Sequence, residues 1–216
     1  MPKIVAISDT HNHHRSLTIP HGDILIHAGD YSNSGSREAT IDFLDWLEAL
    51  PHPHKILIAG NHDFFAERDR KGFRALVPKN ICYLENESVT IENIKIWGSP
   101  FTPYFGGWAF NLHRGAEIKK VWDTIPEDTD ILVTHGPPHG ILDQTYRLEN
   151  VGCEELLLRI NAIKPHYHIF GHIHECPGIK DINGTTFINA TQVDLMYRPV
   201  YDPIVFEYTD QFFTTL

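Results

Sequence analysis

The stretch KILIAGNHD, residues 55–63, decides the fold, because an apolar run of strand length stops at a glycine and passes directly into Asn, His and Asp. Strands that are buried on both faces are continuous apolar runs of this kind. A second such run covers Asp23–Ala28, and apolar residues recur at helical spacing over Glu38–Leu50, where Pro51 ends the helix. The order strand, helix, strand predicts a βαβ unit and therefore parallel pairing of the two strands.

Working outward from this unit, the same pattern of apolar run followed by polar loop occurs five times. The predicted strands are Lys3–Ser8, Asp23–Ala28, Lys55–Ala59, Asp130–Thr134 and His166–Phe170. The loops that follow them begin Asp9-Thr10-His11, Gly29-Asp30, Gly60-Asn61-His62-Asp63, His135-Gly136-Pro137-Pro138 and Gly171-His172-Ile173-His174. Each loop carries a possible metal ligand. In open α/β sheets the carboxyl ends of the strands form the ligand-binding edge, so we expect these side chains to meet there.

The remaining pattern predicts further strands and helices around this framework. Short strands at Ile81–Leu84, Val89–Ile91 and Ile94–Trp97 are separated by polar turns, which favours a meander. Helices are expected at Gly115–Trp122 and Cys153–Ile163, and strands at Thr185–Asn189 and Ile204–Tyr208. The mixture fits an α/β fold, an αββα sandwich of two mixed β-sheets flanked by helices. Because no linker or low-complexity segment interrupts residues 1–216, we expect a single domain.

Composition excludes several classes of protein. The chain has 216 residues and a formal net charge of −10, which argues against a sequence-independent grip on long nucleic acid. No apolar run approaches the length of a membrane span, and the first apolar run is too short for a signal peptide. Three widely spaced cysteines without a CxxC pair favour a reducing, cytoplasmic setting. Fifteen histidines instead point to metal chemistry through imidazole and carboxylate ligands.

The motif series D-x-H, G-D, G-N-H-D, H and G-H-x-H resembles that of the calcineurin-like metallophosphoesterase superfamily. Within it, the chain is most similar to the metallophosphoesterase-domain phosphodiesterases, and the similarity extends over nearly the whole length. It includes ISDTH, GDILIHAGD, IAGNHD, GWAFNLHRG, DILVTHGPPHG, VGCEELL, IFGHIHE and INAT. The resemblance implies the metallophosphoesterase fold and two divalent metal ions.

The same resemblance implies which residues hold the ions. The first ion would be bound by Asp9, His11, Asp30 and His174, and the second by Asp30, Asn61, His135 and His172. A carboxylate shared by both ions offsets the repulsion between two cations that are about 3.5–4 Å apart. Carboxylate, amide and imidazole ligands suit Mn²⁺, Fe²⁺ or Zn²⁺, and Mn²⁺ is expected to support activity in vitro. A water bridging the ions would attack phosphorus.

His62 lies outside this ligand set, and the resemblance assigns it the role of general acid for the leaving oxygen. Asp63 would orient the ring and support the imidazolium. The plainer alternative for His62 is a hydrogen bond to a residue of the metal site. His13, Arg114 and His139 are candidate substrate contacts, with loop anchoring as the alternative for Arg114. The aromatic loop over 99–110 could stack a nucleobase, although a small hydrophobic cluster is the commoner use of such rings.

The sequence therefore predicts a two-metal phosphodiesterase that acts on a small phosphodiester or nucleotide. Cyclic nucleotides are implied by the resemblance alone. A phosphomonoesterase or protein phosphatase with the same metal site is an alternative, because the metal ligands are common to all of them. A weakly active nucleotide-binding protein and a nuclease are further alternatives. The pattern leaves the oligomeric state open.

Overall fold

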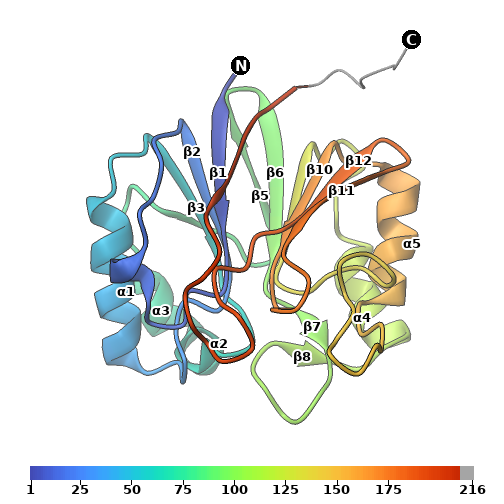
Figure 1. The fold of residues 1–216 in the computed structure, drawn as a ribbon, viewed down its shortest axis with the longest axis horizontal. Coiled ribbons are helices and arrows are strands. Elements are labelled where there is room, and N and C mark those ends of the chain that lie inside the picture. The colour runs from blue at the N-terminus through green and yellow to red at the C-terminus, as the bar shows by residue number, and fades with distance from the viewer. Residues whose placement is uncertain (210–216) are drawn as a thin grey trace.

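The computed structural model describes residues 1–209 and contains two large sheets that face each other (Figure 1). The first sheet has the order β13-β1-β2-β3-β4, with strands Ile204–Glu207, Lys3–Ile7, Ile24–Ala28, His54–Ile58 and Cys82–Tyr83. The second has the order β11-β12-β10-β9-β6-β5, with strands Gly178–Ile182, Thr185–Asn189, Tyr167–Phe170, Ile131–Thr134, Ile94–Ser99 and Glu87–Ile91. A small parallel pair, β7 (Thr102–Pro103) and β8 (Asn111–Leu112), lies apart from both.

Helices cover the outer face of each sheet, so that four layers result. On the first sheet lie α1 (Arg37–Ala49), α2 (Phe64–Arg68) and α3 (Arg70–Leu76), with the short 3₁₀ helix His14–Ser16 beside α1. On the second lie α4 (Ala116–Trp122) and α5 (Glu154–Ile163). This arrangement confirms the predicted αββα sandwich of mixed sheets.

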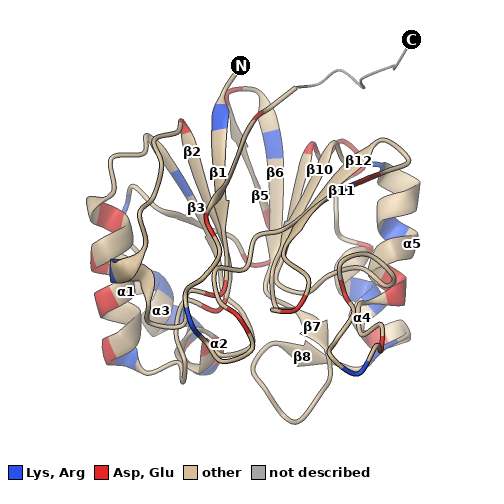
Figure 2. Ribbon diagram, viewed as in Figure 1, with Lys and Arg blue, Asp and Glu red and all other residues tan. Residues whose placement is uncertain are grey.

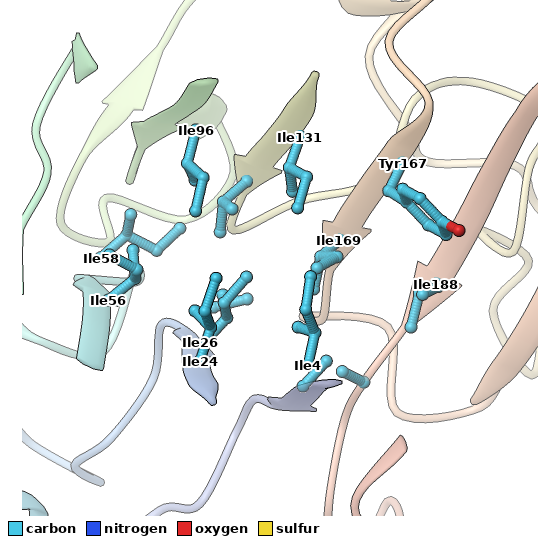
Figure 3. Packing of buried hydrophobic residues seen from close by; sticks show 14 of the residues in the cluster. Ile4, Ile24, Ile26, Ile56, Ile58, Ile96, Ile131, Tyr167, Ile169 and Ile188 are labelled. Carbon is cyan, nitrogen blue, oxygen red and sulfur yellow. The ribbon is translucent and has the colours of Figure 1, made fainter. Parts of the chain in front are cut away.

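The core between the sheets is built mainly from isoleucine. Ile24 and Ile26 project from β2 toward Ile96, Ile131 and the other inward side chains of the second sheet (Figure 3). All of these side chains are buried. Because each central strand also packs against helices on its other face, its apolar run is continuous rather than alternating.

Parallel pairing brings the functional loops to one edge. β1, β2 and β3 pair in parallel, and so do β6, β9, β10 and β12. Their carboxyl ends all lie at the lower edge in Figure 1. This confirms the predicted βαβ unit and places every loop with a possible metal ligand on the same side of the molecule.

The middle of the chain differs from the predicted meander. β4 pairs in parallel with β3, through Ile56 and Cys82, and so belongs to the first sheet, whereas β5 and β6 form an antiparallel hairpin in the second. Helices α2 and α3, over which the sequence pattern predicts no element, explain this difference. They return the chain along the outer face, so β4 re-enters the sheet in the same direction as β3.

Candidate metal centre

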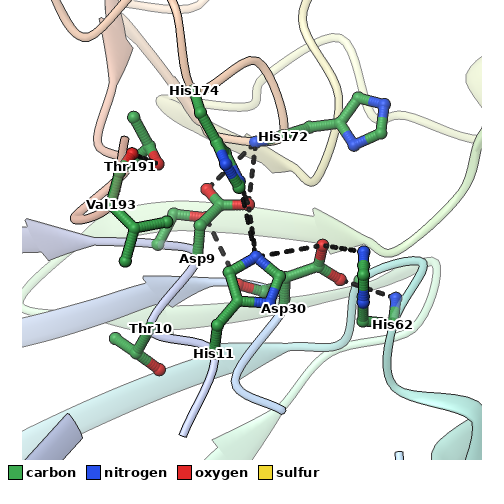
Figure 4. A network of polar contacts seen from close by, with 12 residues as sticks. Asp9, Thr10, His11, Asp30, His62, His172, His174, Thr191 and Val193 are labelled. Carbon is green, nitrogen blue, oxygen red and sulfur yellow. Dashed lines mark hydrogen bonds and ion pairs between the residues drawn. The ribbon is translucent and has the colours of Figure 1, made fainter. Parts of the chain in front are cut away.

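Two buried aspartates stand at the ends of neighbouring strands. Asp9 follows β1 and Asp30 follows β2, and both side chains are buried between the loops of the two sheets (Figure 4). Both residues have positive φ angles, 53° for Asp9 and 55° for Asp30. A left-handed backbone costs about 1–3 kcal/mol in a non-glycine residue and is concentrated at functional sites. The loops therefore hold both carboxylates in place at the expense of local strain.

Asp30 lies between groups from three different loops. Its Oδ2 atom is 3.2 Å from Nε2 of His135 and 3.8 Å from Nε2 of His11. Nε2 of His62 is 4.0 Å from the same oxygen. Beside His135 lies Asn61, whose Oδ1 atom is 2.9 Å from Nε2 of His135. The Asp30 carboxylate thus lies within 4.0 Å of imidazole nitrogens from three loops.

Asp9 lies beside the imidazoles of His174 and His11. Its Oδ1 atom is 3.4 Å from Nε2 of His174 and 3.9 Å from Nε2 of His11. The two imidazole nitrogens are themselves 3.4 Å apart. The backbone N–H of His172 donates to both carboxylate oxygens of Asp9, at 3.1 and 3.0 Å. The loops after β1 and β10 are therefore joined directly across the two sheets.

Glycines permit these close approaches. A Cβ atom on Gly171 would lie 2.0 Å from Oδ2 of Asp9, and one on Gly60 would lie 2.3 Å from Oδ1 of Asp30. Both distances are far below van der Waals contact, so a side chain at either position would displace a carboxylate. The Gly that precedes Asn61, and the Gly that precedes His172, are thus required by packing at the site.

The side chains form three overlapping groups whose possible ligand atoms lie within 4.8 Å of one another: Asp9/His11/His174, His11/Asp30/His62 and Asp30/His135/His172. The first group contains three of the four residues that the resemblance implies for one ion, and the third contains three of the four implied for the other. Asp30 lies outside the first group, and Asn61 lies 2.9 Å from His135 of the third. Carboxylates with imidazoles form a donor set that fits borderline divalent cations. The chain therefore has a candidate dinuclear His/Asp metal site.

The two carboxylates dominate the electrostatics of the site. Burial opposes ionisation of Asp30, but the neighbouring His135 holds the pKa of Asp30 well below its usual range. Burial likewise opposes ionisation of Asp9, and its contact with His174 keeps the pKa of Asp9 low. Burial alone would lower the pKa of His135, yet Asp30 raises it to about 9. Two negative charges are thus held in a region that suits cations.

His62 lies beside the clusters with its ring held on two sides. Nδ1 donates to the carbonyl oxygen of Asn33 at 2.7 Å, which leaves Nε2 turned toward Asp30. The Trp108 ring lies against the imidazole, with ring centroids 4.2 Å apart and an interplanar angle of 32°. The His11 ring contacts the His62 ring edge-on, with ring centroids 4.8 Å apart. The position fits a proton donor to a group bound at the metal centre.

Asp63 does not contact the His62 ring, and the expected pairing of these two residues needs correction. One carboxylate oxygen of Asp63 accepts from the backbone N–H groups of Asp30 and Gly60, at 3.0 and 2.8 Å. The other accepts from the backbone N–H and the hydroxyl of Ser32, at 3.1 and 2.9 Å. The short Asp side chain is therefore occupied by the loop after β2. The carbonyl of Asn33, rather than the carboxylate of Asp63, is therefore the hydrogen-bond partner of the His62 ring.

The three candidate substrate contacts, His13, Arg114 and His139, lie at different places in the structure. Arg114 anchors a loop, since its guanidinium donates to the carbonyls of Gly152 and Val151, at 2.7 and 2.6 Å, and pairs with Glu154. The same side chain lines a cavity of about 350 Å³ next to His172, together with Tyr104 and Phe105. Arg114 thus shares a cavity wall with an expected metal ligand, His172.

His139 and His13 lie elsewhere. Because the turn after Pro138 pairs with Cys153, the His139 ring lies 3.8 Å from Glu154 and 3.9 Å from Asp143 and borders a different cavity. His13 precedes the 3₁₀ helix. Within residues 1–209, its ring has no hydrogen bond, ion pair or ring contact with the clustered Asp and His side chains. Their proposed contact with substrate is therefore not supported by this arrangement.

Sequence reasoning missed one side chain at the site, that of Tyr197. It comes from the loop after β12, and its ring centroid lies 4.7 Å from that of His11. No motif or spacing marked this position. The rings of the 99–110 loop divide between two uses: Phe101 and Phe110 pack on the core, whereas Trp108 covers His62.

Known proteins resemble this chain in sequence and in fold. A family model described as calcineurin-like phosphoesterase matches residues 2–176. The chain is 39% identical over 229 residues to metallophosphoesterase domain-containing protein 1 of Homo sapiens, covering 95% of this chain and 70% of that protein. A UPF0046 protein of Caenorhabditis elegans is 40% identical over 217 residues, covering 94% of this chain and 74% of that protein. The crystal structure of phosphopantetheinyl hydrolase from Mycobacterium tuberculosis shares the fold, with a TM-score of 0.68, 15% identity and 97% coverage of both chains.

Proposed function

The chain belongs to the calcineurin-like phosphoesterase family, and from this membership we propose that it is a two-metal phosphodiesterase acting on small phosphodiesters, cyclic nucleotides among them. The family confirms the resemblance that the motifs indicated. Family membership and the Asp/His clusters together make the chain a metallophosphoesterase. The preference for diesters and the identity of the substrate are proposals.

The observation that carries the proposal is the position of Asp30 between two groups of ligand atoms. Asp9, His11, Asp30 and His174 would hold one ion, and Asp30, Asn61, His135 and His172 would hold the other. Mn²⁺, Fe²⁺ and Zn²⁺ all suit these donors. Two bound divalent ions supply a water of lowered pKa and positive charge for the phosphoryl oxygens.

The protein groups would then orient the substrate and move a proton. We assign to His62 the protonation of the leaving oxygen, because its Nδ1 is held by Asn33 and its Nε2 faces the clusters. Asp63 has a positioning role in this proposal. Its hydrogen bonds fix the backbone of Asp30 and Gly60, and so fix the loops that carry Asp30 and His62.

A small diester is favoured by the space beside the clusters and by the charge of the protein. The cavity of about 350 Å³ next to His172 has aromatic and aliphatic walls, including Tyr104, Phe105 and Val151, and could receive the second ester group that a monoester lacks. In the view of Figure 2, Lys and Arg positions are interspersed with Asp and Glu rather than gathered in a stripe. This distribution and the net charge of −10 favour a small substrate over long nucleic acid.

We propose a cytoplasmic setting from the state of the cysteines. Cys82, Cys153 and Cys176 are all free, which is the state that the cytoplasm maintains. None of the helices within residues 1–209 is both long and apolar enough to span a membrane.

The experiment compares hydrolysis of bis(p-nitrophenyl) phosphate and p-nitrophenyl phosphate by chelator-treated protein, with and without added Mn²⁺. The proposal predicts activity that Mn²⁺ restores and a larger kcat/KM for the diester. A larger kcat/KM for the monoester would make the protein a phosphomonoesterase. Absence of turnover with Mn²⁺, Fe²⁺ and Zn²⁺, together with binding of AMP in calorimetry, would favour a nucleotide-binding protein.

A further inference from the structure

Tyr197 reaches the metal centre from a loop that leaves the second sheet and crosses to the first. At the end of β12 the chain passes beside β1, where the backbone N–H of Gln192 donates to the carbonyl of Ser8 at 3.0 Å. The loop then closes on itself, because Val200 and Tyr201 both donate to the carbonyl of Gln192. In Figure 1 this segment, drawn in red, lies at the same lower edge as the β7–β8 loop. Tyr197 lies between its two ends.

The Tyr197 ring packs against His11 and His174, which belong to the Asp9/His11/His174 group. Ring centroids are 4.7 Å from His11 and 5.4 Å from His174, with interplanar angles of 77° and 86°. The His62 ring lies 6.1 Å away, at 64°. The phenol is therefore adjacent both to two expected ligands of one ion and to the expected proton donor.

The loop holds Tyr197 in this place at the expense of strain. Its φ angle of 59° is an outlier for a bulky side chain. The backbone N–H of Tyr197 donates to the carbonyl of Asp194 at 2.8 Å. The Asp194 carboxylate in turn accepts from the backbone N–H groups of Met196 and Arg198, and pairs with the Arg198 guanidinium at 2.5 Å. Strain that is maintained by a dense turn, with its side chain aimed at a site, is typical of a functional position.

The hydroxyl of Tyr197 is carried by a ring that packs edge-on against His11 and His174. Within residues 1–209 this hydroxyl has no hydrogen-bond partner. The residue is 39% exposed, so a ligand from solvent can reach it. An accessible, uncommitted O–H donor thus lies beside the clusters.

We propose that Tyr197 is a catalytic residue whose hydroxyl donates a hydrogen bond to a non-bridging phosphoryl oxygen of the bound ester. This role rests on the proposed phosphoester hydrolysis and deepens it. Phosphoryl oxygens are the negatively charged acceptors that such a site receives, and the cations would contact other oxygens of the same group. The Asp194 turn is a positioning element, because it acts only by holding Tyr197.

The test removes the hydroxyl and keeps the ring, in Tyr197→Phe. Tyr201→Phe is the matched control, since Tyr201 lies on the same loop and borders a different hollow beside Ser16 and Leu17. One hydrogen bond to a charged acceptor corresponds to a loss of about 10- to 100-fold in kcat/KM for bis(p-nitrophenyl) phosphate. Tyr201→Phe should retain the wild-type value. Equal activity of Tyr197→Phe and the wild type would overturn the proposal.

A second readout does not depend on turnover. Calorimetry on the Mn²⁺-loaded protein should show that Tyr197→Phe binds inorganic phosphate several-fold more weakly than the wild type, with an unchanged number of bound ions. Loss of an ion in Tyr197→Phe would make the phenol a metal ligand and overturn the proposal, as would unchanged phosphate affinity. A wild-type protein that binds phosphate and hydrolyses no diester would contradict the proposed function, and the phosphate affinity would still decide the role of Tyr197.

Discussion

The Nδ1 atom of His62 lies 2.7 Å from the carbonyl oxygen of Asn33, while its Nε2 atom lies 4.0 Å from Oδ2 of Asp30. A carbonyl accepts and cannot donate, so Nδ1 carries the proton in the hydrogen bond. Nε2 is then the atom free to exchange a proton with a bound ester. The loop after β2 thus supplies both Asp30 and the group that orients His62.

His62→Ala tests this role through the leaving group. Hydrolysis of a diester with an alkyl leaving group should slow by about 10²- to 10⁴-fold, because that alkoxide requires protonation. Hydrolysis of bis(p-nitrophenyl) phosphate should slow much less, since nitrophenolate leaves readily as an anion. Steady-state kinetics on both substrates, with metal content measured in parallel, make the comparison. An equal loss on both substrates would show that His62 acts on the metal site or the fold instead.

Asp63→Asn tests the positioning role of the buried carboxylate. The amide NH₂ would face a backbone N–H or the Ser32 hydroxyl in place of an acceptor, so the free energy of unfolding should fall by about 3 kcal/mol or more. Asp69→Asn is the control, because Asp69 caps the more exposed helix α3 through Gly72 and Asn is also a good capping residue. Urea denaturation measures both. Equal stability of the two variants would contradict the role given to Asp63.

Asp30→Ala removes the carboxylate next to both clusters. The variant should lose at least one of two Mn²⁺ ions and nearly all activity, because Oδ2 of Asp30 lies 3.8 Å from Nε2 of His11 and 3.2 Å from Nε2 of His135. Asp42→Ala is the control, since Asp42 is about half exposed and pairs with Arg15 on the surface. Elemental analysis after gel filtration counts the ions. An active Asp30→Ala protein with both ions would rule out the shared carboxylate.

Metal binding should release protons in a pH-dependent way. In the metal-free protein burial disfavours a charged His135, but Asp30 raises the pKa of His135 to about 9 from its usual 6.5. The pair therefore stabilises the metal-free fold fully below about pH 6.5, and this contribution is lost as the pH rises through about 9. A metal ligand must be neutral imidazole, so binding at pH 7.5 releases the His135 proton and affinity rises with pH.

Calorimetric titration with Mn²⁺ in two buffers of different ionisation enthalpy counts these protons. We expect proton release from His135 at pH 7.5 and less release as the pH approaches 9. His135→Asn should release about one proton fewer at pH 7.5. A release that is independent of pH and of His135 would contradict its place in the site.

Most of the fold and the Asp/His clusters were predictable because both depend on a local pattern. An apolar run followed by Asp, Asn or His marks the carboxyl end of a parallel strand, and parallel topology brings such ends together. Asp9 and Asp30 therefore lie at one site (Figure 4), and His135 is 3.2 Å from Asp30. The position of β4 was mispredicted because α2 and α3 gave weak signals, and without them the strand could not be placed beside β3.

The remaining errors concern contacts that no spacing encodes. The choice of Asn33 over Asp63 as partner of His62 depends on a backbone carbonyl, and every residue has one. Tyr197 approaches His11 from a loop that is more than 180 positions later in the chain, and its strained φ angle is visible only in three dimensions. The direction of the His139 ring depends on the turn after Pro138, which places it 3.8 Å from Glu154.

The central claim, two ions that share Asp30, is tested most directly by anomalous diffraction from crystals grown with Mn²⁺. We predict two peaks about 3.5–4 Å apart, one beside Asp9, His11 and His174 and the other beside Asn61, His135 and His172, with the Asp30 carboxylate between them. A single peak, or peaks that do not contact Asp30, would contradict the account.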